Sequence, residues 1–151
     1  MDVCRPDRYR CYRVWRRFIF RVFEPYCIKN KKSIIAYSPL QRGLLTGKLK
    51  PGHVFNDGDH RADLSYFSAE NIRRVNEMLN ALRPLAESKK ASLAQLVLRW
   101  TVDQPGITIA LAGARNAEQA VQNAKAAGIK LTEKEISFIN EQLKSLELEP
   151  A

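Results

Sequence analysis

Residues 107–127 read ITIALAGARNAEQAVQNAKAA, and their hydrophobic pattern changes at Gly113. Before this glycine, residues 107–112 form a short apolar run that is typical of a buried strand. After it, small apolar residues recur at helical spacing over residues 116–127, and Gly128 follows as a predicted C-terminal stop. The stretch therefore predicts a strand, a short loop and a helix, which together make one β/α unit.

A second strand is predicted upstream, in the sequence SIIAY at residues 33–37. Pro39 ends it, because proline has no N–H group to donate in a central ladder. A polar stretch with several glycines then continues to about Tyr66. We expect a long loop here, and loops of this length are often functional.

Three more helices are predicted from their capping residues. Ser68 begins the first, and Pro84 inside its apolar pattern predicts a kink or a restart. Ser92 and Thr132 each open a capping box, S-x-x-Q and T-x-x-E, and the helix after Thr132 is expected to run to about residue 146. Strands that alternate with helices predict an α/β fold with parallel strands.

The length of 151 residues is too short for a complete α/β barrel, which takes about 250 residues. Two strands alone make a poor sheet, so we expect this chain to be part of something larger. Its longest apolar runs stay well below the ~20 residues that a membrane helix needs, and we therefore predict no membrane span.

The formal charge of +9 is concentrated at the N-terminus. Residues 1–32 hold ten of the 25 basic residues but only three of the 16 acidic ones, together with all three cysteines. The remaining residues are almost neutral, so the high isoelectric point says little about what the body of the chain binds. The cysteine spacings match neither a zinc signature nor a disulfide framework, and we expect reduced thiols in the cytoplasm and no metal site.

The basic N-terminal arm has two interpretations. Arginines interrupt its apolar residues, which excludes the continuous apolar segment of a signal peptide. Arginine interleaved with aromatic residues can bind phosphates and stack on bases, so the arm is one candidate for contacting nucleic acid or an anionic membrane. A leader of accidental composition is the interpretation we favour, because charge runs alone are weak signals.

The loop after the first strand, YSPLQRGLLTGK at residues 37–48, carries groups that can hold a diphosphate. Tyr37 can stack on a flat ring. The Ser38 hydroxyl, the backbone amides around Gly43 and the Lys48 cation can bind phosphate oxygens. A plain turn between a strand and a loop is the alternative.

The loop after the second strand, GARNAEQ at residues 113–119, resembles an anion site. A helix N-terminus offers unpaired amides and about half a positive charge, and Arg115 adds a fork of donors. Arg115, Gln119 and either Asn123 or Gln122 lie on one helix face, where they could line an elongated ligand. The alternative is a plain cap with polar residues that face water.

Three segments together make the sequence recognisable: IIAYSPLQRGLLTGK at 34–48, ASLAQLVLRW at 91–100, and the stretch at 107–127 quoted above. From residue 22 to 149 the chain resembles the C-terminal half of an aldo-keto reductase, a family of NADP(H)-dependent (β/α)₈ barrels. The resemblance implies an α/β fold in the form of a partial TIM-type barrel, with few parallel strands and four to five helices. It divides the chain into an atypical leader, residues 1–21, and a half-barrel, residues 22–151.

The resemblance also implies contacts with the cofactor. Tyr37 is similar to the family aromatic residue that stacks on nicotinamide. The segment that resembles the pyrophosphate loop comprises Ser38, Pro39, Leu40, Gln41 and Arg42, with Lys48 and Arg61 closing over it. The segment that resembles the pocket for adenine and the 2′-phosphate comprises Gly113, Arg115, Gln119, Gln122 and Asn123. Arg115 would favour NADP over NAD.

The family's catalytic tetrad of Asp, Tyr, Lys and His sits on the first four strands of the barrel, and no tetrad residue carries over onto this sequence. We therefore expect a truncated aldo-keto reductase that binds NADP(H) weakly and reduces no small carbonyl substrate by itself, because general acid catalysis needs an acid within about 3 Å of the carbonyl oxygen. The alternative is a non-catalytic assembly module, whose open sheet pairs with a complementary half-barrel or with a second copy.

Overall fold

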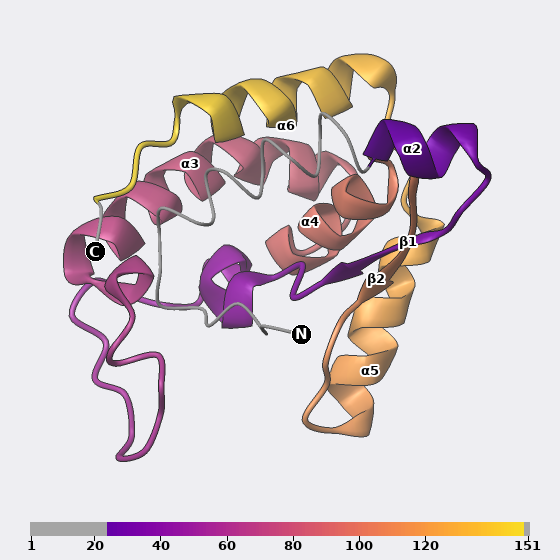
Figure 1. Ribbon diagram of the computed structural model, residues 1–151. Helices are drawn as coiled ribbons and strands as arrows, with labels where there is room; N and C mark the ends of the chain where they lie inside the picture. The colour runs from indigo at the N-terminus through magenta and orange to yellow at the C-terminus, as the bar shows by residue number, and fades with distance from the viewer. Residues whose placement is uncertain (1–23, 150–151) are drawn as a thin grey trace.

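The computed structural model describes residues 24–149 of the chain, and the 1–21 leader lies outside this range. The described residues form five α-helices, three 3₁₀-helices and two strands (Figure 1). In chain order the elements are α2 (Glu24–Lys29), β1 (Ile34–Tyr37), η2 (Gln41–Thr46), η3 (Ser65–Phe67), α3 (Ala69–Ser88), α4 (Leu93–Val102), β2 (Ile107–Leu111), α5 (Ala117–Ala124), η4 (Lys125–Gly128) and α6 (Glu133–Ser145).

The two strands pair in parallel, which confirms the predicted α/β architecture. Ile34 pairs with Ile107 and Tyr37 with Leu111, with an irregularity in register directly after Ile34. The connection between the strands contains α3 and α4, and α4 lies close to β2 (Figure 1). This arrangement brings the carboxyl ends of β1 and β2 side by side, so the two predicted loops begin next to each other.

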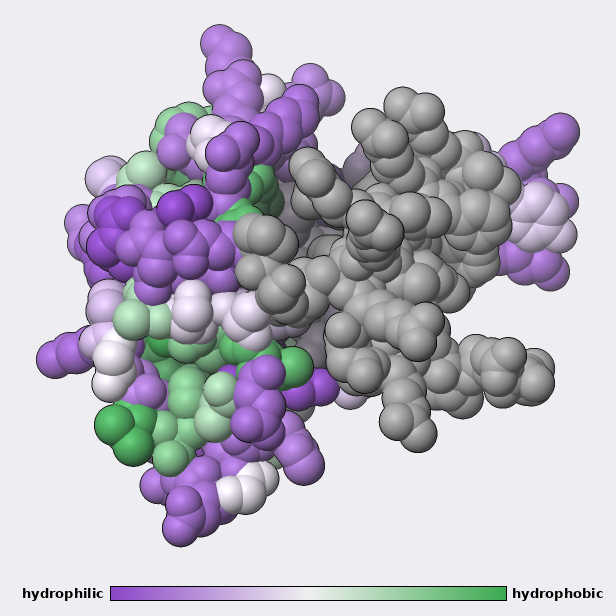
Figure 2. All heavy atoms as spheres, turned by 60° about the vertical axis from the view of Figure 1, so that its left-hand side comes forward, coloured by the Kyte–Doolittle hydropathy of each residue, from purple (hydrophilic) through white to green (hydrophobic). Residues whose placement is uncertain are grey.

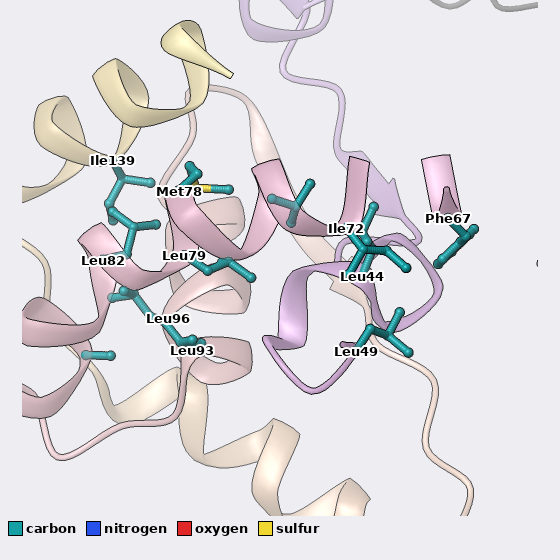
Figure 3. Close-up of a cluster of buried hydrophobic side chains, with 12 residues drawn as sticks. Leu44, Leu49, Phe67, Ile72, Met78, Leu79, Leu82, Leu93, Leu96 and Ile139 are labelled. Carbon is teal, nitrogen blue, oxygen red and sulfur yellow. The ribbon is translucent and has the colours of Figure 1, made fainter. Parts of the chain in front are cut away.

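The main hydrophobic core lies between helices and beside the sheet. Helix α3 packs between α4 and α6, and its residues Leu79 and Leu82 are 1% exposed (Figure 3). Leu96 of α4 is 0% exposed and lies near Leu82, whereas Ile139 of α6 reaches α3 from the other side. Because α3 contacts both neighbouring helices, its apolar face is covered along most of its length.

The predicted helix starts are confirmed. Both capping boxes form. The Ser92 hydroxyl accepts the backbone N–H of Gln95, and the Gln95 side chain accepts the N–H of Ser92. Thr132 and Glu135 make the same two hydrogen bonds at the start of α6. The Ser68 hydroxyl accepts the backbone N–H of Asn71 at 3.1 Å. These local hydrogen bonds satisfy N–H groups that a helix leaves unpaired in its first turn, which is why the sequence signal is reliable there.

The predicted restart at Pro84 is wrong, because α3 continues from Ala69 to Ser88 without interruption. Proline removes one helical hydrogen bond, the one that Asn80 would otherwise accept. Both Pro84 and Asn80 lie on the exposed side of α3, so water can reach the freed carbonyl. Leu82 and Ala86, on the opposite side, are buried and hold the helix against the core before and after the proline.

The helix predicted over residues 116–127 is shorter than expected. The α-helical part, α5, ends at Ala124, and the last residues form the 3₁₀-helix η4 to Gly128. Within α5 none of the residues is buried, and Val121 is 55% exposed. The alanine-rich face that the sequence predicted is therefore only partly covered by the elements that the structure describes.

The sheet also exposes apolar side chains. Ile35 and Tyr37 of β1 and Ile109 and Leu111 of β2 share one face, and their exposed fractions run from 46% to 84%. Figure 2 shows the molecule from another side, where hydrophobic side chains gather between hydrophilic ones. The free thiol of Cys27 is buried. None of the helices in residues 24–149 combines the length and the hydrophobicity that a bilayer crossing requires.

Candidate functional site

The candidate site is formed by the two loops that leave the carboxyl ends of β1 and β2. Tyr37 and Leu111 are register partners, so Ser38 and Ala112 leave the sheet from adjacent positions. Tyr37 is 84% exposed, which leaves its ring available for stacking on a planar ligand. In parallel α/β sheets this end of the strands is where ligands bind.

The first loop has an unusual backbone that the sequence did not predict. Residues Gln41–Thr46 form the 3₁₀-helix η2, whereas the sequence predicted a continuous loop to about Tyr66. Gln41, Arg42 and Gly43 have consecutive positive φ angles of 46°, 53° and 95°, and Ser38 has a φ of 57°. Non-glycine residues rarely adopt this region, and such conformations persist where neighbouring contacts determine them.

Two buried leucines attach this loop to the core. Leu44 is 4% exposed and Leu49 is 9% exposed, and both belong to the main cluster (Figure 3). The Asn76 side chain on α3 donates to the Leu49 carbonyl at 2.8 Å. Between the leucines, Gly47 has a φ of 69°, and a Cβ atom added there would lie 2.8 Å from Leu93 Cδ1. Only glycine fits this approach between the loop and α4.

Arg61 links the later part of the long loop to this unusual turn. Its guanidinium donates to Asp59 from Nε at 3.0 Å and from Nη2 at 2.6 Å, and from Nη1 to the Arg42 carbonyl at 3.2 Å. Hydrogen bonds from the Arg61 side chain and backbone lower the pKa of Asp59 to about 2, with a smaller contribution from the charge of Arg115.

The second loop is held by the side chains of its own helix. Gln119 Oε1 accepts the backbone N–H of Arg115 at 2.9 Å, and Asn123 Nδ2 donates to the Gly113 carbonyl at 3.2 Å. Asn116 caps α5 by accepting the Gln119 N–H at 2.8 Å. Gln119 and Asn123 therefore contact the backbone of this loop from one face of α5, whereas Arg115 lies before the cap of the helix and is not part of that face.

Gln122 points elsewhere. Gln95 of α4 donates through Nε2 to the Gln122 carbonyl at 2.8 Å and to Gln122 Oε1 at 3.2 Å. Of the two candidates Asn123 and Gln122, Asn123 is therefore the one whose side chain contacts the second loop. Gln122 ties α5 to α4 in this structure.

A cavity of about 360 Å³ lies beside the second loop, between α4, β2 and α5. Its lining is mainly alanine and other apolar side chains, and it includes Leu98, Val102, Ala110, Ala114, Ala120 and Asn123. The volume is within the usual range for small-ligand sites. The sequence pattern did not indicate this cavity, because alanines on α5 and β2 look like ordinary packing residues.

Metal ligands do not gather at this site. Among residues 24–149, no three histidine, cysteine, aspartate or glutamate side chains group closely enough to hold an ion. What the site does offer is an exposed aromatic ring, strained backbone, several cations and an apolar cavity. These groups suit an organic anion with planar rings rather than a metal ion.

Known proteins resemble this chain over most of its length. Residues 10–144 match the sequence profile of the Aldo/keto reductase family, and this range includes residues 10–21 of the predicted leader. An aldo-keto reductase of Strobilurus tenacellus is 34% identical over 116 residues, which cover 77% of this chain and 34% of that protein. The NADH-specific methylglyoxal reductase of Escherichia coli is 32% identical over 123 residues, covering 82% of this chain and 37% of that enzyme.

A solved structure agrees with this relationship. The glycerol dehydrogenase from Gluconobacter oxydans superposes with a TM-score of 0.77 at 30% identity, over 88% of this chain and 40% of that chain. The chain spans about a third of the length of the curated relatives described above. Sequence profile, relatives and fold agree, and the chain belongs to the aldo-keto reductase family.

Proposed function

We propose that this chain carries the C-terminal part of an NADP(H) site, as a truncated form of a carbonyl reductase that acts on small aldehydes or ketones. The observation that supports this most is that two loops with phosphate-binding groups leave the carboxyl ends of paired strands from adjacent positions. One relative is NADH-specific by name, so membership of the family does not determine which coenzyme is used. The choice of NADP(H) therefore rests on Arg115.

The first loop would hold the nicotinamide half of the coenzyme. Tyr37 would stack on the nicotinamide ring, because its own ring is exposed at the end of β1. The pyrophosphate would lie over the turn that contains the positive φ angles, near the exposed side chains of Arg42 and Lys48. The residues proposed for this contact are Ser38, Pro39, Leu40, Gln41, Arg42 and Lys48.

The second loop would hold the adenosine half. Arg115 stands before the N-terminus of α5, where the helix dipole and its guanidinium both favour a 2′-phosphate. Gln119 and Asn123 would fix the loop around Gly113 through the hydrogen bonds described above. The apolar cavity beside Asn123 would accept the adenine ring, and Gln122 would support the pocket from the α4 side.

The coenzyme, when bound, supplies a hydride for a carbonyl carbon. A proton must then reach the carbonyl oxygen from a general acid held close to it. The proposed coenzyme contacts provide binding and orientation but include no residue in that role. We therefore expect the chain alone to bind the coenzyme without turnover. We also propose the cytoplasm as the location of this chain, because its cysteine spacings match no disulfide framework.

Replacing Arg115 with alanine tests the coenzyme assignment. The dissociation constant for NADPH, measured by calorimetry, should rise by about 10- to 100-fold, because a charge-assisted hydrogen bond to the 2′-phosphate is lost. The dissociation constant for NADH, which lacks this phosphate, should change by less than about threefold.

The matched control is Lys125→Ala, which removes an exposed cation from the opposite end of the same helix. It should leave both dissociation constants unchanged. Equal weakening of NADPH and NADH by Arg115→Ala would contradict the 2′-phosphate assignment. Reduction of an aldehyde by the wild-type chain with NADPH would contradict the expectation of an inactive truncated enzyme.

A second candidate function is assembly, and the exposed apolar face of the sheet favours it. Within the described residues each strand has one hydrogen-bonded neighbour, so each has one free edge. Free edges and exposed apolar side chains both promote pairing with further strands. A second copy of the chain can supply such strands, and so can a complementary half-barrel.

Light scattering on the purified chain tests assembly. The mass in solution should be at least twice that of the 17.2 kDa chain. Ile109→Glu should shift the population to the monomer, because it places a charge on the exposed face between the strands. As a control, Thr108→Glu changes an exposed neighbour in β2 outside the apolar row and should have a smaller effect. A stable wild-type monomer would contradict self-assembly.

A further inference from the structure

The Arg61 side chain makes contacts that its proposed place beside the pyrophosphate does not explain. Three of its nitrogen atoms donate hydrogen bonds inside the protein: Nε and Nη2 to the Asp59 carboxylate, and Nη1 to the Arg42 carbonyl. The Arg61 side chain is only 19% exposed and that of Asp59 25%. A guanidinium that is committed in this way has few donors left for a phosphate.

Aromatic rings connect this pair to the core. The Arg61 guanidinium lies over the Phe55 ring, 4.9 Å from its centroid. Phe55 packs edge-on against Phe67 with the ring centroids 5.6 Å apart, and Phe67 is buried in the main cluster. The position of Arg61 is therefore fixed by its contact with the Phe55 ring and by its ion pair with Asp59.

The Arg42 carbonyl that Arg61 contacts belongs to the peptide between two residues with positive φ angles, Arg42 and Gly43. The same peptide unit contributes the N–H of Gly43, which donates to the Leu40 carbonyl at 2.9 Å. The peptide plane is thus held on both sides, between Arg61 and Leu40. Arg42 and Gly43 both have positive φ angles, and the arginine needs external contacts to stay in that conformation.

We propose that Asp59 and Arg61 are positioning residues, which lock the turn of Gln41, Arg42 and Gly43 into the shape that receives the coenzyme pyrophosphate. Asp59 orients the Arg61 guanidinium, and Arg61 holds the Arg42 carbonyl away from the ligand side. The consequence for coenzyme affinity rests on the proposed function, whereas the effect on the turn itself does not.

The chain contains a matched control for this ion pair. On α4, Arg99 and Asp103 form the same fork of two hydrogen bonds, with side-chain exposures of 23% and 17%. This pair is similarly exposed but lies within one helix, away from the turn. Asp103→Asn therefore removes an equivalent ion pair without touching the proposed lock.

Hydrogen exchange resolved by residue tests the lock without any coenzyme. In Asp59→Asn, the amides of Gly43 and Leu45 should exchange at least about tenfold faster than in the wild type, because the conformation that pairs both with Leu40 is weakened. Asp103→Asn should leave these two amides unchanged. Unchanged exchange at Gly43 in Asp59→Asn, with the variant folded by circular dichroism, would overturn the proposal.

Arg61→Lys separates positioning from direct phosphate binding. Lysine keeps the positive charge but cannot form the fork to Asp59 and the bond to Arg42 together. We expect fast exchange at Gly43 and a loss of NADPH affinity as large as that in Asp59→Asn. If Arg61→Lys keeps the NADPH affinity and the slow exchange of the Gly43 amide, Arg61 binds the phosphate directly and the positioning role is overturned. If the wild type binds no NADPH, the proposed function fails, and the exchange data still decide the lock.

Discussion

Leu96→Ala is expected to lower the free energy of unfolding by about 3 kcal/mol, measured by urea denaturation. Leu96 is 0% exposed and lies on α4 where it meets α3, close to Leu82 and Leu93 (Figure 3). The substitution removes three carbon atoms and leaves a cavity between two helices that are held from other sides. Because α4 also borders β2, loosening it affects the support of both site loops.

Leu131→Ala is the control for this substitution. It makes the same chemical change at a residue that is half-buried at the edge of the same cluster. The substitution should lower the free energy of unfolding by only about 1 kcal/mol, because the half-buried Leu131 side chain contributes less buried apolar area than Leu96 does. A loss at Leu96 no larger than that at Leu131 would show that α3 and α4 are not the packed centre of this chain.

The second large effect is expected for Asn71→Ala, at about 2 to 4 kcal/mol. Asn71 is 0% exposed, and its side chain joins three segments. Its Nδ2 donates to the Ser65 carbonyl at 2.8 Å, and its Oδ1 accepts the Glu149 N–H at 2.8 Å. Alanine leaves those backbone groups without partners and detaches the C-terminal segment from the start of α3.

The matched control is Asn80→Ala, at an exposed position on the same helix. It should change the free energy of unfolding by less than about 0.5 kcal/mol. A second measurement distinguishes detachment from general loosening: limited proteolysis should cleave Asn71→Ala after α6 first, while the helices stay protected. Wild-type stability in Asn71→Ala, or cleavage that begins within α3, would contradict the role assigned to this residue.

Pattern and capping chemistry predicted much of this fold. The strands at Ile34 and Ile107 and the helix starts at Ser92 and Thr132 lie within a residue or two of their predicted places. Those signals are local, since a capping box satisfies its own helix end and an apolar run next to glycine marks its own boundary. The placement of Gln119 and Asn123 on one face of α5 also follows from helical spacing alone.

Other features depended on contacts between segments that are distant in the sequence. Helix α3 continues through Pro84 because its buried face packs on the core, while water can reach the carbonyl that the proline leaves unpaired on the exposed face. The Arg42 carbonyl, in the turn with positive φ angles, accepts a hydrogen bond from Arg61, nineteen residues further along the chain. The orientation of Gln122 was set by Gln95 on another helix.

The sequence by itself thus determined where strands and helices begin, the parallel α/β class and the family, because these depend on neighbours along the chain. Only the tertiary structure decided which polar side chains serve the protein and which remain available to a ligand. Asn71, Gln122 and Arg61 all look like surface residues in the sequence, yet each makes a hydrogen bond to a distant segment of the chain. The physical reason is that a buried or strained polar group must find its partner in space, whatever the distance along the chain.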